Sequence, residues 1–241
     1  QSLSLLSDQD RKAVLDELFV RGAGDNFTIC RTPVGANDFS IDFYSFDETE
    51  GDFELRDFSI DRDRTTLLPL VKEALQRNPE LRIWSSPWCP PSWMKYNKHY
   101  AMKPDTVNDL PEERRGYEGQ DMFIQEDSYF DAYARYFGKY IDAYREQGVD
   151  VSMVMPQNEM NSDQNFPSCC WTSADLNTFI GQYLGPEMEK HGTEVYYYNG
   201  HAKKLADTIK NQMVQDLKLK DGETRFASFV LTRPTMPVSV L

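Results

Sequence analysis

Short apolar runs alternate with amphipathic helical stretches along this 241-residue chain. The first helical pattern follows Ser7, whose hydroxyl suits an N-cap, and the fourth follows Ser173. The others span 65–76 and 129–147, and the aromatic stripe of the latter is expected to pack in the core. Strands that alternate with helices form parallel βα units, so we assign residues 1–241 to one α/β domain. The predicted strands span 26–31, 82–86, 151–155, 194–198 and 226–231.

The strand predicted at 151–155 ends abruptly at Pro156 and is followed by Asn158 and Glu159. A continuous apolar run of this length is typical of a parallel strand that is buried on both faces. A carboxylate just past the carboxyl end of such a strand lies where α/β barrels keep their catalytic groups. Asn158 beside it can hold a substrate hydroxyl. The alternative is that Glu159 only begins a surface loop.

A proline-rich loop follows the strand predicted at 82–86, and it carries Trp88 and Trp93. Three prolines restrict the backbone of this loop. They hold both tryptophans at the same strand-end level as Glu159. Because rigid, exposed aromatic rings stack well on the apolar face of a sugar, we expect both to bind substrate. The alternative is that each ring packs beneath its own loop.

These two loops resemble the signature segments of a known enzyme family. Residues 86–95 and 157–159 are similar to those of glycoside hydrolase family 30, which includes glucosylceramidases and endo-β-1,6-glucanases. The resemblance covers about residues 2–198, whereas 199–241 match the family poorly. It implies an α/β fold of the (β/α)8 TIM-barrel type. Further segments that agree in order are 29–33, 38–40, 44–47, 52–53 and 183–186.

The resemblance also implies the chemistry, which is glycoside hydrolysis with retention at the anomeric carbon. It places the acid/base on Glu159 and a contact with the sugar 2-hydroxyl on Asn158. It matches Arg31, Asp38 and Trp88 to residues that line a glucose-binding subsite. The implied substrate is a β-glucan or another β-glucoside.

Two parts of the family pattern are missing from this sequence. No strand pattern stands before the first helix, and no Glu follows the strand predicted at 226–231, where the nucleophile is expected. Glu223 precedes that strand and is therefore expected at the opposite end of a barrel. We expect an incomplete barrel that lacks its first and last strands, lacks the nucleophile and is inactive alone. The alternatives are a non-catalytic carbohydrate-binding remnant and a fragment without independent function.

A long insert at 96–127 follows the proline-rich loop and shows no apolar periodicity. Loops at the carboxyl end of a barrel form the substrate cleft, so Tyr96 is a candidate for a distal sugar subsite. The alternative is a solvated, charged loop.

Composition excludes several other classes of protein. The net charge of −13 argues against a nucleic-acid partner, and the absence of any long apolar run argues against a membrane span. Cysteine and histidine spacings match no metal or redox motif, so we expect no metal and no cofactor. The family resemblance implies a secreted or periplasmic protein, although no signal-peptide pattern begins this chain.

Overall fold

The structure of the protein, a computed structural model, describes residues 2–196. Within that range, four strands form one parallel sheet in the order β1-β2-β3-β4. Each strand pairs with the next one along the chain, as expected for successive βα units. The prediction of parallel βα units is therefore confirmed. The strands are β1 (Ile29–Pro33), β2 (Arg82–Ser86), β3 (Val151–Val154) and β4 (Glu194–Val195).

The register of the sheet brings the carboxyl ends of the strands to one edge. Pro33 pairs with Ser86, and Val154 pairs with both Ser85 and Val195. The loops that follow β1, β2 and β3 therefore start side by side. The prediction for β2 was correct at both ends, but β1 starts later than predicted. Asn26, at a φ of 55°, has left-handed backbone that cannot belong to a strand.

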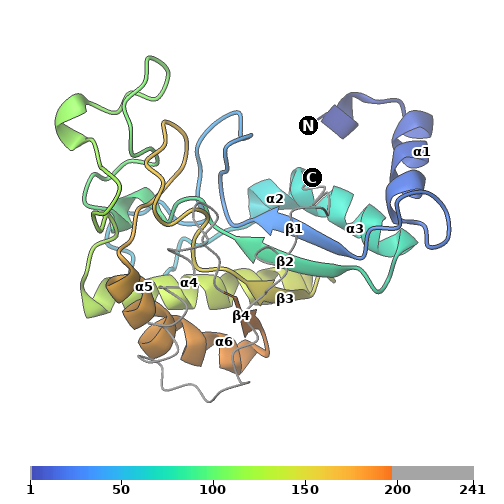
Figure 1. Ribbon diagram of the computed structural model, residues 1–241. Helices are drawn as coiled ribbons and strands as arrows, with labels where there is room; N and C mark the ends of the chain where they lie inside the picture. The colour runs from blue at the N-terminus through green and yellow to red at the C-terminus, as the bar shows by residue number, and fades with distance from the viewer. Residues whose placement is uncertain (1, 197–241) are drawn as a thin grey trace.

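Helices connect the strands and cover the sheet. Figure 1 shows α4 running along the sheet, with α5 and α6 beside it and the long loop after β2 extending away in green. The α-helices are α1 (Asp8–Phe19), α2 (Asp61–Thr65), α3 (Leu67–Arg77), α4 (Asp127–Glu146), α5 (Ser173–Phe179) and α6 (Gly185–His191). A π-helical turn, Ile180–Leu184, joins α5 to α6, and short 3₁₀ turns cover Ser2–Leu5, Ser92–Met94 and Glu112–Arg114.

Two helix starts test the capping predictions. The Ser7 hydroxyl accepts the backbone N–H of Asp10 at 3.1 Å, which confirms Ser7 as the N-cap of α1. The cap of α5 is Thr172 rather than Ser173, because the Thr172 hydroxyl accepts the N–H of Asp175 at 3.3 Å. Thr172 has extended backbone, whereas Ser173 already belongs to the helix, and an N-cap requires the former.

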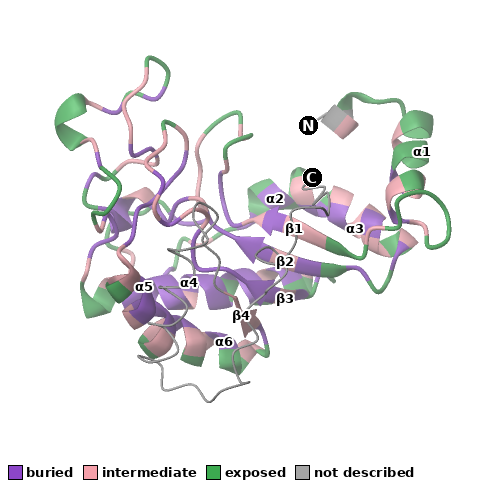
Figure 2. Cartoon of the chain, viewed as in Figure 1, coloured by how far each residue is buried: buried purple, intermediate pink, exposed green. Residues whose placement is uncertain are grey.

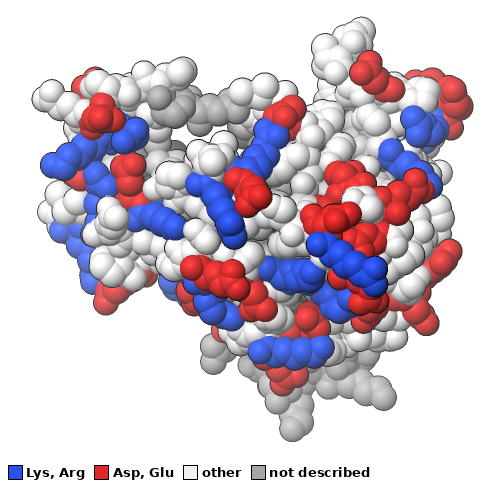
Figure 3. Space-filling view, turned by 180° about the vertical axis from the view of Figure 1, so that it is seen from behind, with Lys and Arg blue, Asp and Glu red and all other residues white. Residues whose placement is uncertain are grey.

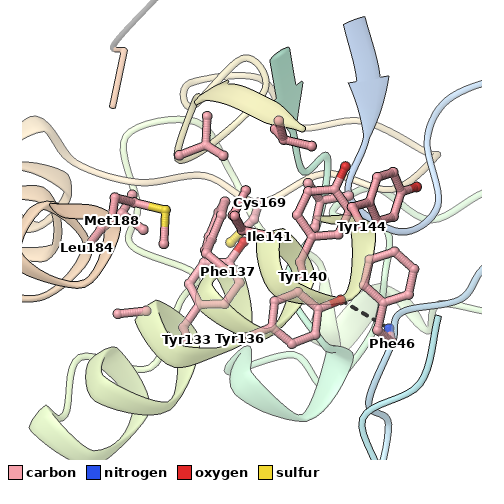
Figure 4. Close-up of a cluster of buried hydrophobic side chains, with 14 of the residues drawn as sticks. Phe46, Tyr133, Tyr136, Phe137, Tyr140, Ile141, Tyr144, Cys169, Leu184 and Met188 are labelled. Atoms are coloured by element: carbon pink, nitrogen blue, oxygen red, sulfur yellow. Dashed lines mark hydrogen bonds between the residues drawn. The ribbon is translucent and has the colours of Figure 1, made fainter. Parts of the chain in front are cut away.

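The core lies between the sheet and an aromatic face of α4. Figure 2 shows this helix and the sheet as the buried centre of the molecule, and Figure 4 shows the tyrosines and phenylalanines that fill it. The tyrosine hydroxyls also form hydrogen bonds with buried polar groups. Tyr140 bonds Ser85 of β2 at 2.9 Å, and Tyr136 accepts the N–H of Phe46 at 3.0 Å. The predicted core role of this aromatic stripe is confirmed.

The surface carries both signs of charge. On the face shown in Figure 3, Lys and Arg side chains lie among Asp and Glu side chains. Exposed pairs of this kind, such as Arg135 with Asp131 at 2.9 Å, contribute only about 0–1 kcal/mol each. None of the helices within residues 2–196 is long and apolar enough to cross a membrane.

Candidate active site

A pocket of about 230 Å³ opens at the carboxyl edge of the sheet. Its walls come from β1 and from the loops that follow β1, β2 and β3. Because these loops start side by side, residues far apart in the sequence meet there. The lining residues are Arg31, Pro33, Asn37, Asp38, Phe39, Trp88, Asn158 and Glu159. The structure therefore brings together five of the seven predicted site residues.

Arg31 contacts residues of the two loops that follow β2 and β3. Its Nη2 donates to Oδ1 of Asn158 at 2.7 Å, and its Nε donates to Oγ of Ser86 at 3.0 Å. Its guanidinium also stacks over the ring of Trp88, 4.2 Å from the centroid. Charge-assisted hydrogen bonds and cation–π contacts both favour such an arrangement. Arg31 thus fixes Asn158 and Trp88 relative to one another.

Trp84 is a neighbour of this group that sequence reasoning missed. It pairs in register with Arg31 across β1 and β2, and the Arg31 guanidinium lies 4.7 Å from the centre of its ring. The guanidinium therefore contacts two tryptophan rings. The sequence pattern that could have identified Trp84 is the alternation of side chains along β2, which puts Trp84 on the same face of the strand as Ser86.

Glu159 lies in strained backbone. Its φ of 45° is in the left-handed region, which residues other than glycine rarely adopt. Hydrogen bonds hold the chain on both sides: the N–H of Asn158 donates to the Pro87 carbonyl at 2.7 Å, and the N–H of Trp171 donates to the Met160 carbonyl at 2.8 Å. Backbone strain persists where surrounding contacts enforce it, and such positions gather at functional sites.

Trp93 and Tyr96 do not line the pocket. Trp93 is only 3% exposed; its indole N–H donates to the carbonyl oxygen of Asp47 at 3.1 Å, and its ring packs against Phe53 and Tyr129. The prediction of an exposed Trp93 ring is therefore wrong, because these distant partners bury it beneath the loop. Tyr96 is exposed, and its hydroxyl accepts the N–H of Gln125 at 3.2 Å. Its role in a distal subsite stays a prediction.

A buried lysine joins the loops around the pocket. Lys95 is fully buried, and its ammonium donates to the carbonyl oxygens of His99 at 2.6 Å, Tyr100 at 3.1 Å and Ser168 at 2.7 Å. His99 and Tyr100 belong to the insert after β2, whereas Ser168 belongs to the loop that follows Glu159. A single cation therefore holds the two loops together.

Two carboxyl groups away from the pocket have raised pKa values. Burial raises the pKa of Asp47 to about 6, and the charges of Asp52 and Asp57 act in the same direction. Burial, together with the neighbouring carboxyl of Asp175, raises the pKa of Asp121 to about 6. Asp47 belongs to the loop that follows β1, and Asp121 belongs to the loop that follows β2. Within residues 2–196, no cluster of His, Cys, Asp and Glu side chains is arranged to hold a metal ion.

Comparison with known proteins decides the family. A family model described as the glycosyl hydrolase family 30 TIM-barrel domain matches residues 1–198. The chain belongs to glycosyl hydrolase family 30. The predicted fold class, an incomplete (β/α)8 barrel, is thereby confirmed, and the four parallel strands are part of that barrel. The strand predicted at 226–231, Glu223 and the poorly matched segment 199–241 lie outside the described residues.

Relatives of the chain include enzymes of two named activities. The endo-1,6-β-D-glucanase of Trichoderma harzianum is 30% identical over 200 residues, which cover 80% of this chain and 39% of that protein. The lysosomal acid glucosylceramidase of Mus musculus is 30% identical over 196 residues, which cover 79% of this chain and 35% of that protein. The chain thus spans well under half the length of these relatives.

Solved structures show the same fold. SrfJ from Salmonella typhimurium matches with a TM-score of 0.73 at 24% identity, over 87% of this chain and 43% of that one. An endo-β1,6-glucanase matches with a TM-score of 0.72 at 27% identity, over 89% of this chain and 46% of that one.

Proposed function

We propose that the protein hydrolyses a β-linked glucoside with retention, and that Glu159 is its acid/base. The observation that carries this proposal is the pocket, where Glu159 and Asn158 meet Arg31, Asp38 and Trp88 at the carboxyl edge of a parallel sheet. Family membership supports the reaction class, and the named activities of the relatives support a β-linked glucose unit as substrate. The name of the mouse relative fits a compartment outside the cytosol, and we propose a secreted or periplasmic protein.

In this proposal Glu159 first donates its proton to the leaving oxygen and later removes a proton from the attacking water. The reaction also needs a nucleophilic carboxylate, and we assign that role to none of residues 2–196. The described residues would therefore contribute the acid/base and the sugar-binding part of the site.

Asn158 has a defined orientation for this role. A guanidinium can only donate, so the side-chain atom of Asn158 that faces Arg31 at 2.7 Å is its oxygen. The NH₂ group of Asn158 is left for the substrate. It would donate to the sugar 2-hydroxyl, where hydrogen bonds strengthen in the transition state.

Trp88 would supply the platform for the ring. The Arg31 guanidinium lies over one face of its indole, 4.2 Å from the centroid. We place the sugar against the opposite face, where the apolar C–H face of glucose packs on an aromatic ring. A neutral sugar is unaffected by the acidic charge of the chain.

The proposal is tested on the purified chain with a β-1,6-linked glucose disaccharide and an activated aryl β-glucoside. We expect Trp88→Ala to abolish binding of the disaccharide, measured by calorimetry, and Glu159→Gln to preserve it. The matched control is Trp93→Phe, because Trp93 is buried and does not line the pocket. This variant should bind the disaccharide as the unmodified chain does. No binding by the unmodified chain, or equal binding by the Trp88 variant, would overturn the proposed site.

Turnover of the aryl glucoside separates the remaining hypotheses. Binding without turnover is the result expected if no carboxylate of this chain acts as nucleophile. Turnover that disappears in Glu159→Gln would show instead that a second carboxylate of this chain serves as nucleophile.

A further inference from the structure

Gln157 is a buried side chain with every polar group in use. It is 2% exposed and lies between β3 and the Asn158–Glu159 pair. Its Nε2 donates to the carbonyl oxygens of Trp88 at 2.7 Å and Asn158 at 2.8 Å. Its Oε1 accepts the indole N–H of Trp171 at 3.3 Å. Both donors and the acceptor of the amide are therefore satisfied.

The two carbonyls that Gln157 holds belong to different loops of the pocket. One follows β2 and carries Trp88, and the other follows β3 and carries Asn158. One NH₂ group thus sets the position of the proposed sugar platform relative to the residue before Glu159. A second link runs beside it, from the N–H of Asn158 to the carbonyl of Pro87 at 2.7 Å.

The position of the Asn158 carbonyl affects the backbone conformation of Glu159. It belongs to the peptide plane that extends from the Asn158 Cα to the Glu159 Cα, and the φ of Glu159 is the rotation about the N–Cα bond at the end of this plane. That φ is 45°, in the sparsely populated left-handed region. By fixing the plane, the hydrogen bond from Gln157 helps to set the direction in which the Glu159 carboxyl leaves the backbone.

The third contact prevents Gln157 from turning. Trp171 is 1% exposed and stacks on Phe123, with ring centroids 4.6 Å apart. Because an indole N–H only donates, the atom of Gln157 that faces it is the oxygen. The NH₂ group is therefore directed at the two carbonyls. The core thus fixes the orientation of an amide that holds the backbone of two pocket-lining residues.

We propose that Gln157 is a positioning residue, which fixes the Trp88 platform relative to Asn158 and Glu159 through the backbone carbonyls of Trp88 and Asn158. It does so from beneath the pocket, without contact to the sugar. The effect on sugar binding rests on the proposed function, whereas the effect on the loops does not.

The test compares Gln157→Glu with the unmodified chain. The substitution keeps the shape, but an ionised carboxylate has no donor and faces two carbonyl oxygens. The control is Gln125→Glu, since Nε2 of Gln125 also donates to a backbone carbonyl, that of Phe123 at 2.8 Å, and Gln125 does not line the pocket.

Hydrogen exchange of single amides gives the first readout. Gln157→Glu should lower the protection of the Asn158 N–H at least about tenfold, and Gln125→Glu should leave it unchanged. Binding of the β-1,6-linked glucose disaccharide gives the second readout. We expect affinity to fall about tenfold or more in Gln157→Glu and to recover partly at low pH, because a protonated carboxyl regains one donor.

The outcomes are distinct. Unchanged protection in Gln157→Glu would overturn the positioning role. If the unmodified chain fails to bind the disaccharide, the proposed function fails, and the exchange data still decide the role of Gln157. If Gln157→Glu does not fold, Gln157→Asn serves in its place, because its neutral but shorter amide cannot reach both carbonyls. Protection and affinity in that variant equal to those of the unmodified chain would refute the proposal.

Discussion

Arg31→Lys is the sharpest perturbation of the pocket, because it keeps the charge and removes only the planar fork. A lysine ammonium cannot stack on Trp88 and Trp84 while it bonds Asn158 and Ser86. The loss comprises cation–π contacts worth about 0.5–1 kcal/mol each and one charge-assisted hydrogen bond worth about 1.5–3 kcal/mol. Since Arg31 is only half-buried, we take the lower values and expect a loss of about 2.5 kcal/mol.

That loss has two measurable consequences. The midpoint of thermal unfolding should fall by about 5–10 °C. Affinity for the β-1,6-linked glucose disaccharide, followed by tryptophan fluorescence, should fall about tenfold or more, because neither Asn158 nor Trp88 stays in place. The matched control is Arg115→Lys. The Arg115 guanidinium also lies over an aromatic ring, 4.9 Å from the centroid of Tyr117, but outside the pocket.

Two results would refute this reasoning. If Arg31→Lys unfolds and binds like the unmodified chain, the planar guanidinium is not needed to hold the pocket together. If it keeps its unfolding midpoint but loses binding, Arg31 acts by direct contact with the sugar, as the family resemblance alone implies. A loss of equal size in Arg115→Lys would show a general effect of removing a stacked guanidinium.

Other parts of the site are open to equally direct tests. Lys95→Met leaves buried carbonyls unsatisfied at about 1–3 kcal/mol each, so urea unfolding should show a loss of at least about 3 kcal/mol. The same substitution at the exposed Lys98, which is paired with Glu50, should cost far less stability, and equal losses would contradict the role of Lys95. Burial raises the pKa of Asp47 from 3.8 to about 6, so the folded protein favours the protonated carboxyl. Its contribution to stability is therefore complete below about pH 4 and is lost as the pH rises through 6. Asp47→Asn should therefore gain stability relative to the unmodified chain between pH 4 and pH 7; a constant difference in urea midpoints would contradict this. In an active enzyme with this site, Glu159→Gln should slow hydrolysis of a poor leaving group by about 10²–10⁴-fold and of an activated aryl glucoside less, and equal losses would argue for a structural role.

The carboxyl-edge pocket could be predicted from the sequence because it depends only on where individual strands end. The strand at 82–86 and the apolar run that ends at Pro156 mark where two parallel strands stop. Parallel strands end at one edge, so the residues just after them must meet. This places Trp88, Asn158 and Glu159 together without knowledge of their partners.

The difference between Trp88 and Trp93 could not be predicted in this way. Both stand in the same proline-rich loop, and both satisfy the pattern of a sugar platform. Trp93 is buried because the carbonyl of Asp47 and the rings of Phe53 and Tyr129 surround it, and all three are distant in sequence. Lys95 was missed for the same reason, since the carbonyls it holds come from two loops.

The pocket has one further consequence for how such enzymes vary. All of its lining residues lie in a single uninterrupted stretch of sequence, from Arg31 to Glu159. In the proposed function, the part of sugar recognition that residues 2–196 contribute is therefore encoded in one continuous segment of the chain. Recombination at points outside this stretch would transfer these lining residues together, so the contribution that we propose they make to sugar binding would be inherited as a unit.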